Sequence, residues 1–482
     1  MKKTKQIIFF IVLLILVALN ILPKEINDMD EIWNYNFANC IAQGLVPYKD
    51  FNIVQTPLLP IISGLILKLT INQLLVMRIL AIILSGSILF LIYKILDSLK
   101  IDKNINLLTI IILFCLLKNY LCIDYNFFAL FLTLLIMYIE LKNKKDSALN
   151  NLFIGILGGL VILTKQSIGL FVCISIIGYR LIFLFKNKEN KKEKIKKILL
   201  RIIGISTPVI VFIIYLLMNH SVNEFIDYAI LGLATFTNKM SYLTLITKGD
   251  LVIKIMAIIV PVLLITELVY SIKKHDEKMF IVTLLSLSMF VVVFPISDVI
   301  HFLIGSTTSL IGLVYMLNNF FREKGINLDS SLKIYVYIMI FALIIVEGFG
   351  FYSKYKKIET YSNLNHFKYI PISSNLEEYI HIIDEYIVNN KTNVYILNHD
   401  AALFMIPINR YNKNYDMFLI GNLGKDGEEG QIEKIKNEDA IYMIKTDEIP
   451  MNWQNPEKVR NYIKNNLEKF GEGYDFYFYK NK

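Results

Sequence analysis

The chain has 482 residues, 55% of them hydrophobic, and a formal net charge of +9. Soluble domains seldom reach this hydrophobic fraction, so the composition indicates a polytopic membrane protein rather than a soluble enzyme. The positive charge would also fit a nucleic-acid-binding protein, but lysine and arginine collected in cytoplasmic loops explain it without any nucleic-acid partner.

The chain begins with the basic stretch MKKTK and continues with a long apolar run. No small-residue cleavage site follows, so we interpret this run as an uncleaved first transmembrane helix whose N-terminus is cytoplasmic. Ten later apolar segments predict further spans. They lie at about 73–96, 105–119, 126–141, 150–164, 167–185, 199–218, 251–271, 279–295, 302–320 and 331–349. The expected fold class is an α-helical polytopic membrane protein with about eleven transmembrane helices.

The charges of the connecting loops predict how these helices are oriented. With eleven spans, the lysine-rich loops all fall on one side, the strongest being FKNKENKKEKIKKILLR at 185–201. The positive-inside rule makes that side cytoplasmic and the C-terminus external, in a multi-pass protein of the plasma membrane. The apolar segment 57–69 is too short to span, so we interpret it as an interfacial helix within one long outer loop, 23–72.

From about residue 351 the sequence changes character. Short strand-like runs alternate with stretches of helical periodicity, which predicts a small α/β domain outside the membrane. The strand-like runs are 393–410, 415–422, 439–446 and 474–480, and the helical stretches are 375–390 and 457–471. The predicted domains are a transmembrane module, 1–350, and an extracytoplasmic α/β domain, 351–482.

Isolated polar residues gather at the predicted outer ends of the apolar segments. They are Asp28, Asp30, Glu31, Arg78, Asp124, Lys165, Asp298 and His301. Ionisable groups are costly near a membrane, so their gathering at one face indicates a functional cavity there. A transporter would more often place such groups near the bilayer midplane.

The acids of the first outer loop also have a structural interpretation. Asp28 and Glu31 fit the N-cap and capping-box positions of a helix that starts near Met29. Asp30 differs, because on such a helix it shares a mainly apolar face with Trp33 and Phe37. An acid on that face is not an ordinary solvated charge.

The remaining polar residues allow similar alternatives. Arg78 and Lys165 can extend their side chains to the lipid headgroups, as long basic side chains near membrane surfaces do. Asp298 fits the N-cap of a helix, with His301 as a satisfied histidine in its first turn. Structural and functional interpretations therefore both stay open for these four residues.

The stretch from Ile26 to Pro60 carries a family resemblance. An Asp-Glu pair follows the first transmembrane segment, an amphipathic helix ends in AQGLVPYKDF, and a proline-led apolar helix comes next. With the outer-loop acid Asp124, the LTKQ turn and the Asp298…His301 turn, this order resembles the GT-C superfamily of membrane glycosyltransferases over about residues 1–320. It is most similar to the family 39-like group, which includes bacterial enzymes like the dolichyl-phosphate-mannose protein mannosyltransferases and the lipid A aminoarabinose transferases.

The resemblance implies an enzyme that moves a sugar from a polyprenyl-phosphate donor to a glycan, lipid or protein acceptor at the outer membrane face. It also implies that Asp30, the Asp of the Asp-Glu pair, is the catalytic base, with Glu31 and Asp124 as further catalytic candidates. The chain departs from the aminoarabinose transferases just before Pro57, where VQTP stands in place of a phosphate-binding lysine. That donor contact is therefore not carried over.

The residue types suit this chemistry by themselves. Inverting sugar transfer needs a carboxylate to take the proton of the acceptor hydroxyl, and Asp30 is suited to that role. The leaving phosphate needs cations or a metal ion. Arg78 and Lys165 can supply the charge, and Asp298 and His301 are further substrate-binding candidates.

The sequence contains no motif for a nucleotide or redox cofactor. The sequence has no Walker loop, no dinucleotide glycine fingerprint and no CxxC pair. Asp30 and Asp124, on separate outer loops, would permit a divalent metal ion, as in oligosaccharyltransferase-like members of the superfamily, whereas other members need none. No cofactor is therefore predicted with certainty.

Two other functional classes stay open. A flippase or polymerase for lipid-linked sugars of the cell envelope would tolerate the loss of one acid but would need a continuous polar pathway. A membrane sensor or scaffold without enzyme activity would not depend on the outer-loop acids at all.

Overall fold

The computed structural model describes most of the chain: residues 3–26, 29–142, 147–186, 191–236, 240–326, 328–413, 417–446 and 455–482. Contacts divide it into two compact units. Unit 1 comprises Met1–Leu22, Ala81–Phe212 and Met240–Ser353, and unit 2 comprises Pro23–Leu80, Ile213–Lys239 and Lys354–Lys482. Residues 23–72, predicted to form one long outer loop, thus group with the C-terminal residues. The predicted domain division at residue 351 stays a prediction.

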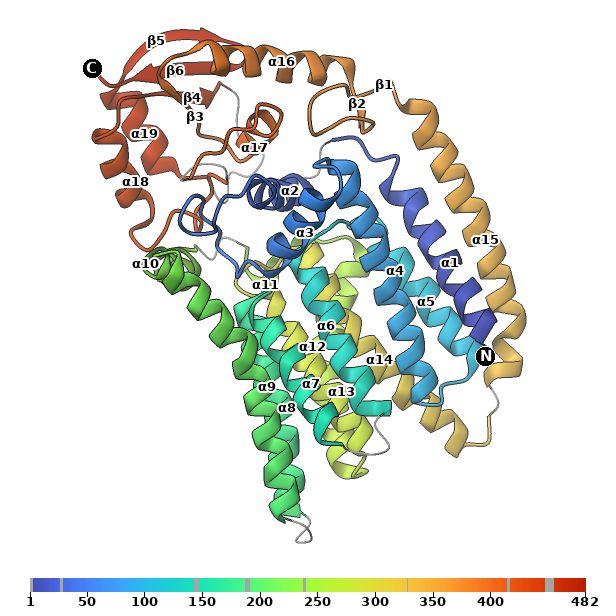
Figure 1. The fold of residues 1–482 in the computed structure, drawn as a ribbon. Coiled ribbons are helices and arrows are strands. Elements are labelled where there is room, and N and C mark those ends of the chain that lie inside the picture. Colours follow the sequence, from blue (N-terminus) through green and yellow to red (C-terminus); the bar gives the residue numbers. More distant parts are fainter. Residues whose placement is uncertain are drawn as a thin grey trace. The chain divides into compact units, whose positions relative to one another are not determined.

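Each of the eleven predicted apolar segments is a helix (Figure 1). They are α1 (Lys3–Ile21), α4 (Leu74–Ser98), α5 (Lys103–Leu117), α6 (Tyr125–Lys142), α7 (Ala148–Ile162), α8 (Gln166–Lys186), α9 (Lys191–Met218), α12 (Leu251–Lys273), α13 (Glu277–Phe290), α14 (Val299–Glu323) and α15 (Leu328–Lys357). Two short elements, α11 (Tyr242–Lys248) and the 3₁₀ turn η3 (Val291–Val293), connect them.

Seven of these helices are long and apolar enough to cross a membrane, namely α1, α4, α6, α9, α12, α14 and α15. Among the shorter apolar helices are α5, α7 and α8. The protein is therefore a multi-pass membrane protein, and the count of eleven spans stays a prediction.

Close helix packing inside unit 1 depends on small residues. A Cβ atom on Gly155 of α7 would lie 2.3 Å from the carbonyl oxygen of Arg201 in α9, so only glycine lets these helices approach. The Arg201 side chain is buried and pairs with Glu140 of α6 at 2.6 Å. At the far side of the unit, Asn20 of α1 donates to Glu347 of α15 at 2.8 Å.

Unit 2 contains the first outer loop and the C-terminal α/β part. The loop forms α2 (Met29–Ala42) and α3 (Leu58–Leu69), and the connection after α9 forms α10 (Val222–Phe225), the π-helix η1 (Ile226–Leu231) and the 3₁₀ helix η2 (Gly232–Thr235). The predicted short helix at 57–69 is thus confirmed as a helix. Its interfacial position stays a prediction.

The C-terminal part is built on a four-stranded sheet of order β3-β4-β6-β5, in which β3 and β4 are parallel and the other pairs antiparallel. Its elements are β1 (Thr360–Tyr361), β2 (Pro371–Ile372), α16 (Ser374–Asn389), β3 (Asn393–Ile396), α17 (Ala401–Met405), α18 (Gly427–Lys436), β4 (Ala440–Lys445), α19 (Glu457–Asn466), β5 (Glu468–Gly473) and β6 (Phe476–Lys480). Helices α18 and α19 share a core with one sheet face, whereas the Tyr386 ring of α16 lies 4.9 Å from the Phe478 ring of β6, with the ring planes tilted by 50°.

The predicted fold class is confirmed, but three local predictions about the C-terminal part are wrong. The run 393–410 holds a strand only at 393–396, and 401–405 is helical. No strand is found in the described residues 417–422 of the run 415–422, whose first two residues lie outside the description. Residues 468–471, predicted helical, belong to β5. Tyr474 and Asp475 form a two-residue hairpin turn, with φ of 55° and 61°, and this turn pairs β5 with β6 as an antiparallel strand.

Membrane orientation is a testable expectation. In a cysteine-free background, Glu433→Cys is expected to react with an impermeant thiol reagent in intact cells, because the C-terminal part is predicted outside. Lys196→Cys, in the lysine-rich start of α9 that is predicted to be cytoplasmic, is expected to react only after permeabilisation. The reverse labelling pattern would overturn the predicted topology.

Candidate active site

Helix α2 presents the first pair of candidate acids, within unit 2. Asp30 and Glu31 occupy its first turn. Asp30 is half-buried, and its backbone carbonyl accepts a hydrogen bond from the Asn34 amide at 2.8 Å. Glu31 is 2% exposed. Asp28 lies outside the described residues, so its predicted capping role is not tested.

Glu31 has a partner that the sequence did not indicate. Both of its carboxylate oxygens accept from the Arg78 guanidinium, at 3.0 Å from Nε and 2.9 Å from Nη2. Arg78 is 0% exposed and also donates to the Lys24 carbonyl at 2.5 Å. The interpretation that Arg78 extends to the headgroups is therefore wrong, because this two-point ion pair joins α2 to α4 inside unit 2.

Two further candidate acids begin helices of unit 1. Asp124 precedes α6, and its Oδ1 accepts from the backbone N–H groups of Asn126 and Phe127 at 2.7 and 3.3 Å. Asp298 caps α14, accepting from both the backbone N–H of His301, at 2.8 Å, and its ring Nδ1, at 2.8 Å. The predicted cap at Asp298 and the satisfied histidine are confirmed.

Lys165 is a positive charge that acts on both Asp124 and Asp298. It lies in the turn between α7 and α8 and is half-buried. Its Nζ donates to the Asn126 side-chain oxygen at 2.6 Å and stands 5.2 Å from the centre of the Tyr125 ring. The lysine thus points toward the start of α6.

The pKa values of the two capping acids are shifted in opposite directions. Burial raises the pKa of the Asp124 carboxyl, although backbone hydrogen bonds and the charges of His301 and Lys165 act against it. Burial also opposes ionisation of Asp298, but its contacts with His301, helped by Lys165, outweigh burial and lower its pKa. Asp124, Lys165, Asp298 and His301 therefore form one interacting group at a single end of unit 1.

The structure thus brings the predicted residues into two groups. Asp30, Glu31 and Arg78 gather in unit 2, and Asp124, Lys165, Asp298 and His301 gather in unit 1. Sequence reasoning missed Asn126, whose signal was its place two residues after Asp124 in the motif IDYNFF.

The residues fit a metal ion poorly. Among the described residues, no three His, Cys, Asp or Glu side chains gather as metal ligands would. One oxygen of Asp124 already accepts two backbone hydrogen bonds. The described residues therefore form no metal site.

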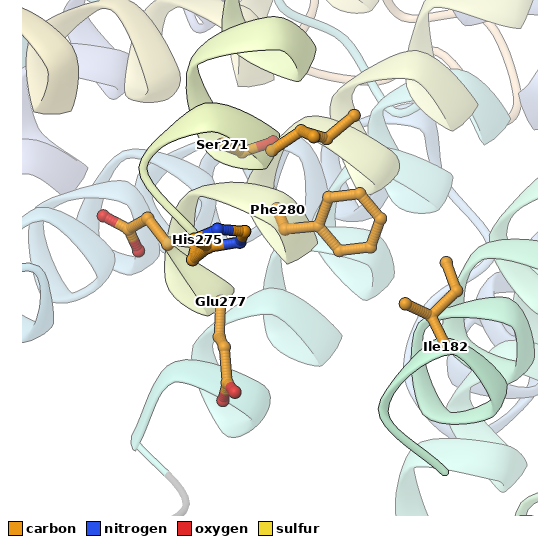
Figure 2. A pocket seen from close by; sticks show the side chains of 7 residues that line it. Ile182, Ser271, His275, Glu277 and Phe280 are labelled. Carbon is orange, nitrogen blue, oxygen red and sulfur yellow. The ribbon is translucent and has the colours of Figure 1, made fainter. Parts of the chain in front are cut away.

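A cavity of about 320 Å³ also occurs in unit 1, where α12 turns into α13 (Figure 2). It is lined by Ile182, Ser271, Ile272, His275, Asp276, Glu277 and Phe280. None of the predicted site residues lines it, and the turn belongs to a loop predicted to be cytoplasmic. This cavity is therefore separate from the candidate active site.

Comparison with known proteins supports the fold. No protein-family model and no curated protein matches the chain. The crystal structure of ArnT from Cupriavidus metallidurans bound to undecaprenyl phosphate does match, with a TM-score of 0.56 and 10% sequence identity, over 100% of this chain and 99% of that one. The chain has the fold of ArnT. The structure of ArnT in the apo state matches equally, with a TM-score of 0.56, 10% identity and coverage of 99% and 97%. The predicted GT-C resemblance is thereby confirmed at the level of the fold.

Proposed function

We propose that this chain is an integral membrane glycosyltransferase that uses a polyprenyl-phosphate-linked sugar at the outer membrane face. The observation that carries the proposal is the likeness of its whole length to the fold of ArnT, a GT-C lipid A aminoarabinose transferase crystallised with undecaprenyl phosphate. The acceptor of the proposed enzyme would be a glycan, a lipid or a protein.

In the proposed reaction, Asp30 is the general base. Its carboxylate takes the proton of the acceptor hydroxyl while the hydroxyl oxygen attacks the anomeric carbon of the sugar. The bond between that carbon and the phosphate oxygen breaks, the configuration inverts, and polyprenyl phosphate leaves. A half-buried acid at the start of α2 suits this role because it is accessible yet partly shielded from water.

The departing phosphate gains negative charge that a fixed cation can stabilise. Lys165 is our candidate for that cation, since Asn126 and the Tyr125 ring hold its ammonium group in place. Asp298 and His301 would help to orient the substrate, and Asp124 would set the charge around Lys165. Arg78 is already paired with Glu31, so we assign this pair to the support of α2.

The proposal is tested with a panel of radiolabelled polyprenyl-phosphate sugars supplied to membranes that contain the protein. We expect transfer of one sugar to an acceptor, with release of polyprenyl phosphate, and a loss of tenfold or more in Lys165→Ala, because a charge-assisted contact is worth about 1.5–3 kcal/mol. The matched control is Lys142→Ala, since Lys142 also lies 5.2 Å from a tyrosine ring but sits at the other end of α6. Movement of the intact donor across the membrane without transfer would instead support a flippase.

A further inference from the structure

The C-terminal part of unit 2 holds the acid-bearing helix α2 at several points. The Trp33 indole N–H donates to the His399 carbonyl at 2.8 Å, and the bond is buried. Just before α2, the Ile26 N–H donates to the Pro371 carbonyl at 3.1 Å. Residues more than 300 positions away in the sequence therefore fix the position of the helix that carries Asp30.

His366 contributes hydrogen bonds from both its ring and its backbone. Its ring Nδ1 is 2.8 Å from the Asn72 backbone carbonyl, an atom that only accepts, so the ring donates there. Its Nε2 is 2.7 Å from the Asn409 side-chain oxygen. His366 is 7% exposed and has a φ of 70°, a left-handed conformation unusual for residues other than glycine.

The backbone of His366 contacts both helices of the Glu31–Arg78 pair. Its carbonyl accepts from the Leu74 N–H at 2.8 Å and from the Tyr35 hydroxyl at 3.4 Å. Tyr35 lies one helical turn after Glu31 on α2, and Leu74 lies one turn before Arg78 on α4. His366 therefore supports each half of that ion pair from one turn away.

Amide side chains extend the contact along the polar face of α2. Asn72 donates to the Asn39 side-chain oxygen at 2.6 Å, and Gln43 donates both to that oxygen and to the Asn409 oxygen, at 3.1 Å each. This face lies opposite the one predicted to carry Asp30. The network therefore holds α2 by the face opposite the one predicted to carry Asp30.

We propose that His366 is a positioning residue of the C-terminal part, which fixes α2 and the start of α4 and thereby the base Asp30. This inference rests on the proposed function, because it assumes that Asp30 reacts. It assigns the C-terminal part an indirect role in catalysis, through the position of α2, since even about 1 Å of misplacement of a catalytic group can cost about 10²-fold in rate.

The variant His366→Phe tests the proposal, since phenylalanine keeps a ring of similar size but cannot donate. We expect kcat to fall about 10²-fold, the KM for the lipid donor to stay unchanged, and amide hydrogen exchange to accelerate within α2 but not within α16. His366→Gln, which keeps one donor group, is expected to recover part of the lost kcat. The matched control is His381→Phe, because His381 is an exposed histidine of α16.

Each outcome decides the proposal. If amide hydrogen exchange in α2 of His366→Phe is unchanged, the proposal is overturned at any rate of sugar transfer. If exchange in α2 is faster but kcat is normal, the contact has only a structural role and the proposal is also overturned. If the unmodified protein transfers no sugar, the proposed function fails, whereas the exchange experiment still shows whether His366 holds α2. Should His366→Phe not fold, Tyr35→Phe removes one hydroxyl from the same contact and is expected to lower kcat several-fold.

Discussion

Asp30→Asn is expected to lower sugar transfer by about 10²–10⁴-fold, the usual contribution of a general base. Asparagine keeps the size of the side chain and much of its hydrogen bonding, but its amide cannot accept the proton of an attacking hydroxyl. Binding of the lipid donor should persist, because the substitution leaves Lys165, the proposed cation for the phosphate, in place. The measurement is the initial rate of label transfer in membranes, at equal amounts of folded protein.

The matched control for this experiment is Asp475→Asn. Asp475 is exposed in the β5–β6 turn, at a left-handed φ of 61° that asparagine also tolerates, so neither fold nor rate should change. Near-normal transfer by Asp30→Asn would remove the base assignment. The carboxylates of Asp124 and Asp298 would then be the next candidates, and the acids of α2 would be structural.

Features encoded by adjacent residues could be predicted from the sequence. A long apolar run carries its own signal, so each of the eleven segments is a helix, and seven of them are long and apolar enough to cross a membrane. The cap at Asp298 was also found, because its partner is three residues away. The failures in the C-terminal part arose where local signals are ambiguous: the apolar run at 401–405 suits a buried strand as well as a helix, and the structure makes it helical.

Contacts between distant residues could not be predicted in the same way. Glu31 looked like a capping-box acid from its local spacing, yet its carboxylate pairs with Arg78, 47 positions later. Similarly, His366 stands in a loop with no motif and meets Asn72 only in the folded chain. A single sequence shows which residues are unusual at a membrane face, but their pairing depends on how the helices pack.

The Glu31–Arg78 pair yields the second large expected effect, on stability. Arg78→Met is expected to lower the free energy of unfolding by about 3–5 kcal/mol, because it leaves the Glu31 carboxylate buried without a counter-charge. Glu31→Gln should cost a similar amount of stability, because it leaves the Arg78 guanidinium buried without a counter-charge. This loss is larger than the ~1 kcal/mol expected of a simple helix cap. Intrinsic fluorescence during denaturation in detergent would measure these losses.

The double variant Glu31→Gln/Arg78→Met separates the pair from its surroundings. Because it leaves no unpaired buried charge, it is expected to be more stable than either single variant, which gives a favourable coupling energy in the double-mutant cycle. The matched control is Arg322→Met, which breaks the partly exposed pair of Arg322 with Asp102 and should cost less than about 1 kcal/mol. Losses that simply add in the double variant would mean that the two side chains do not support each other. The start of α2 would then be held by other contacts, with those of His366, Trp33 and Ile26 the first to examine.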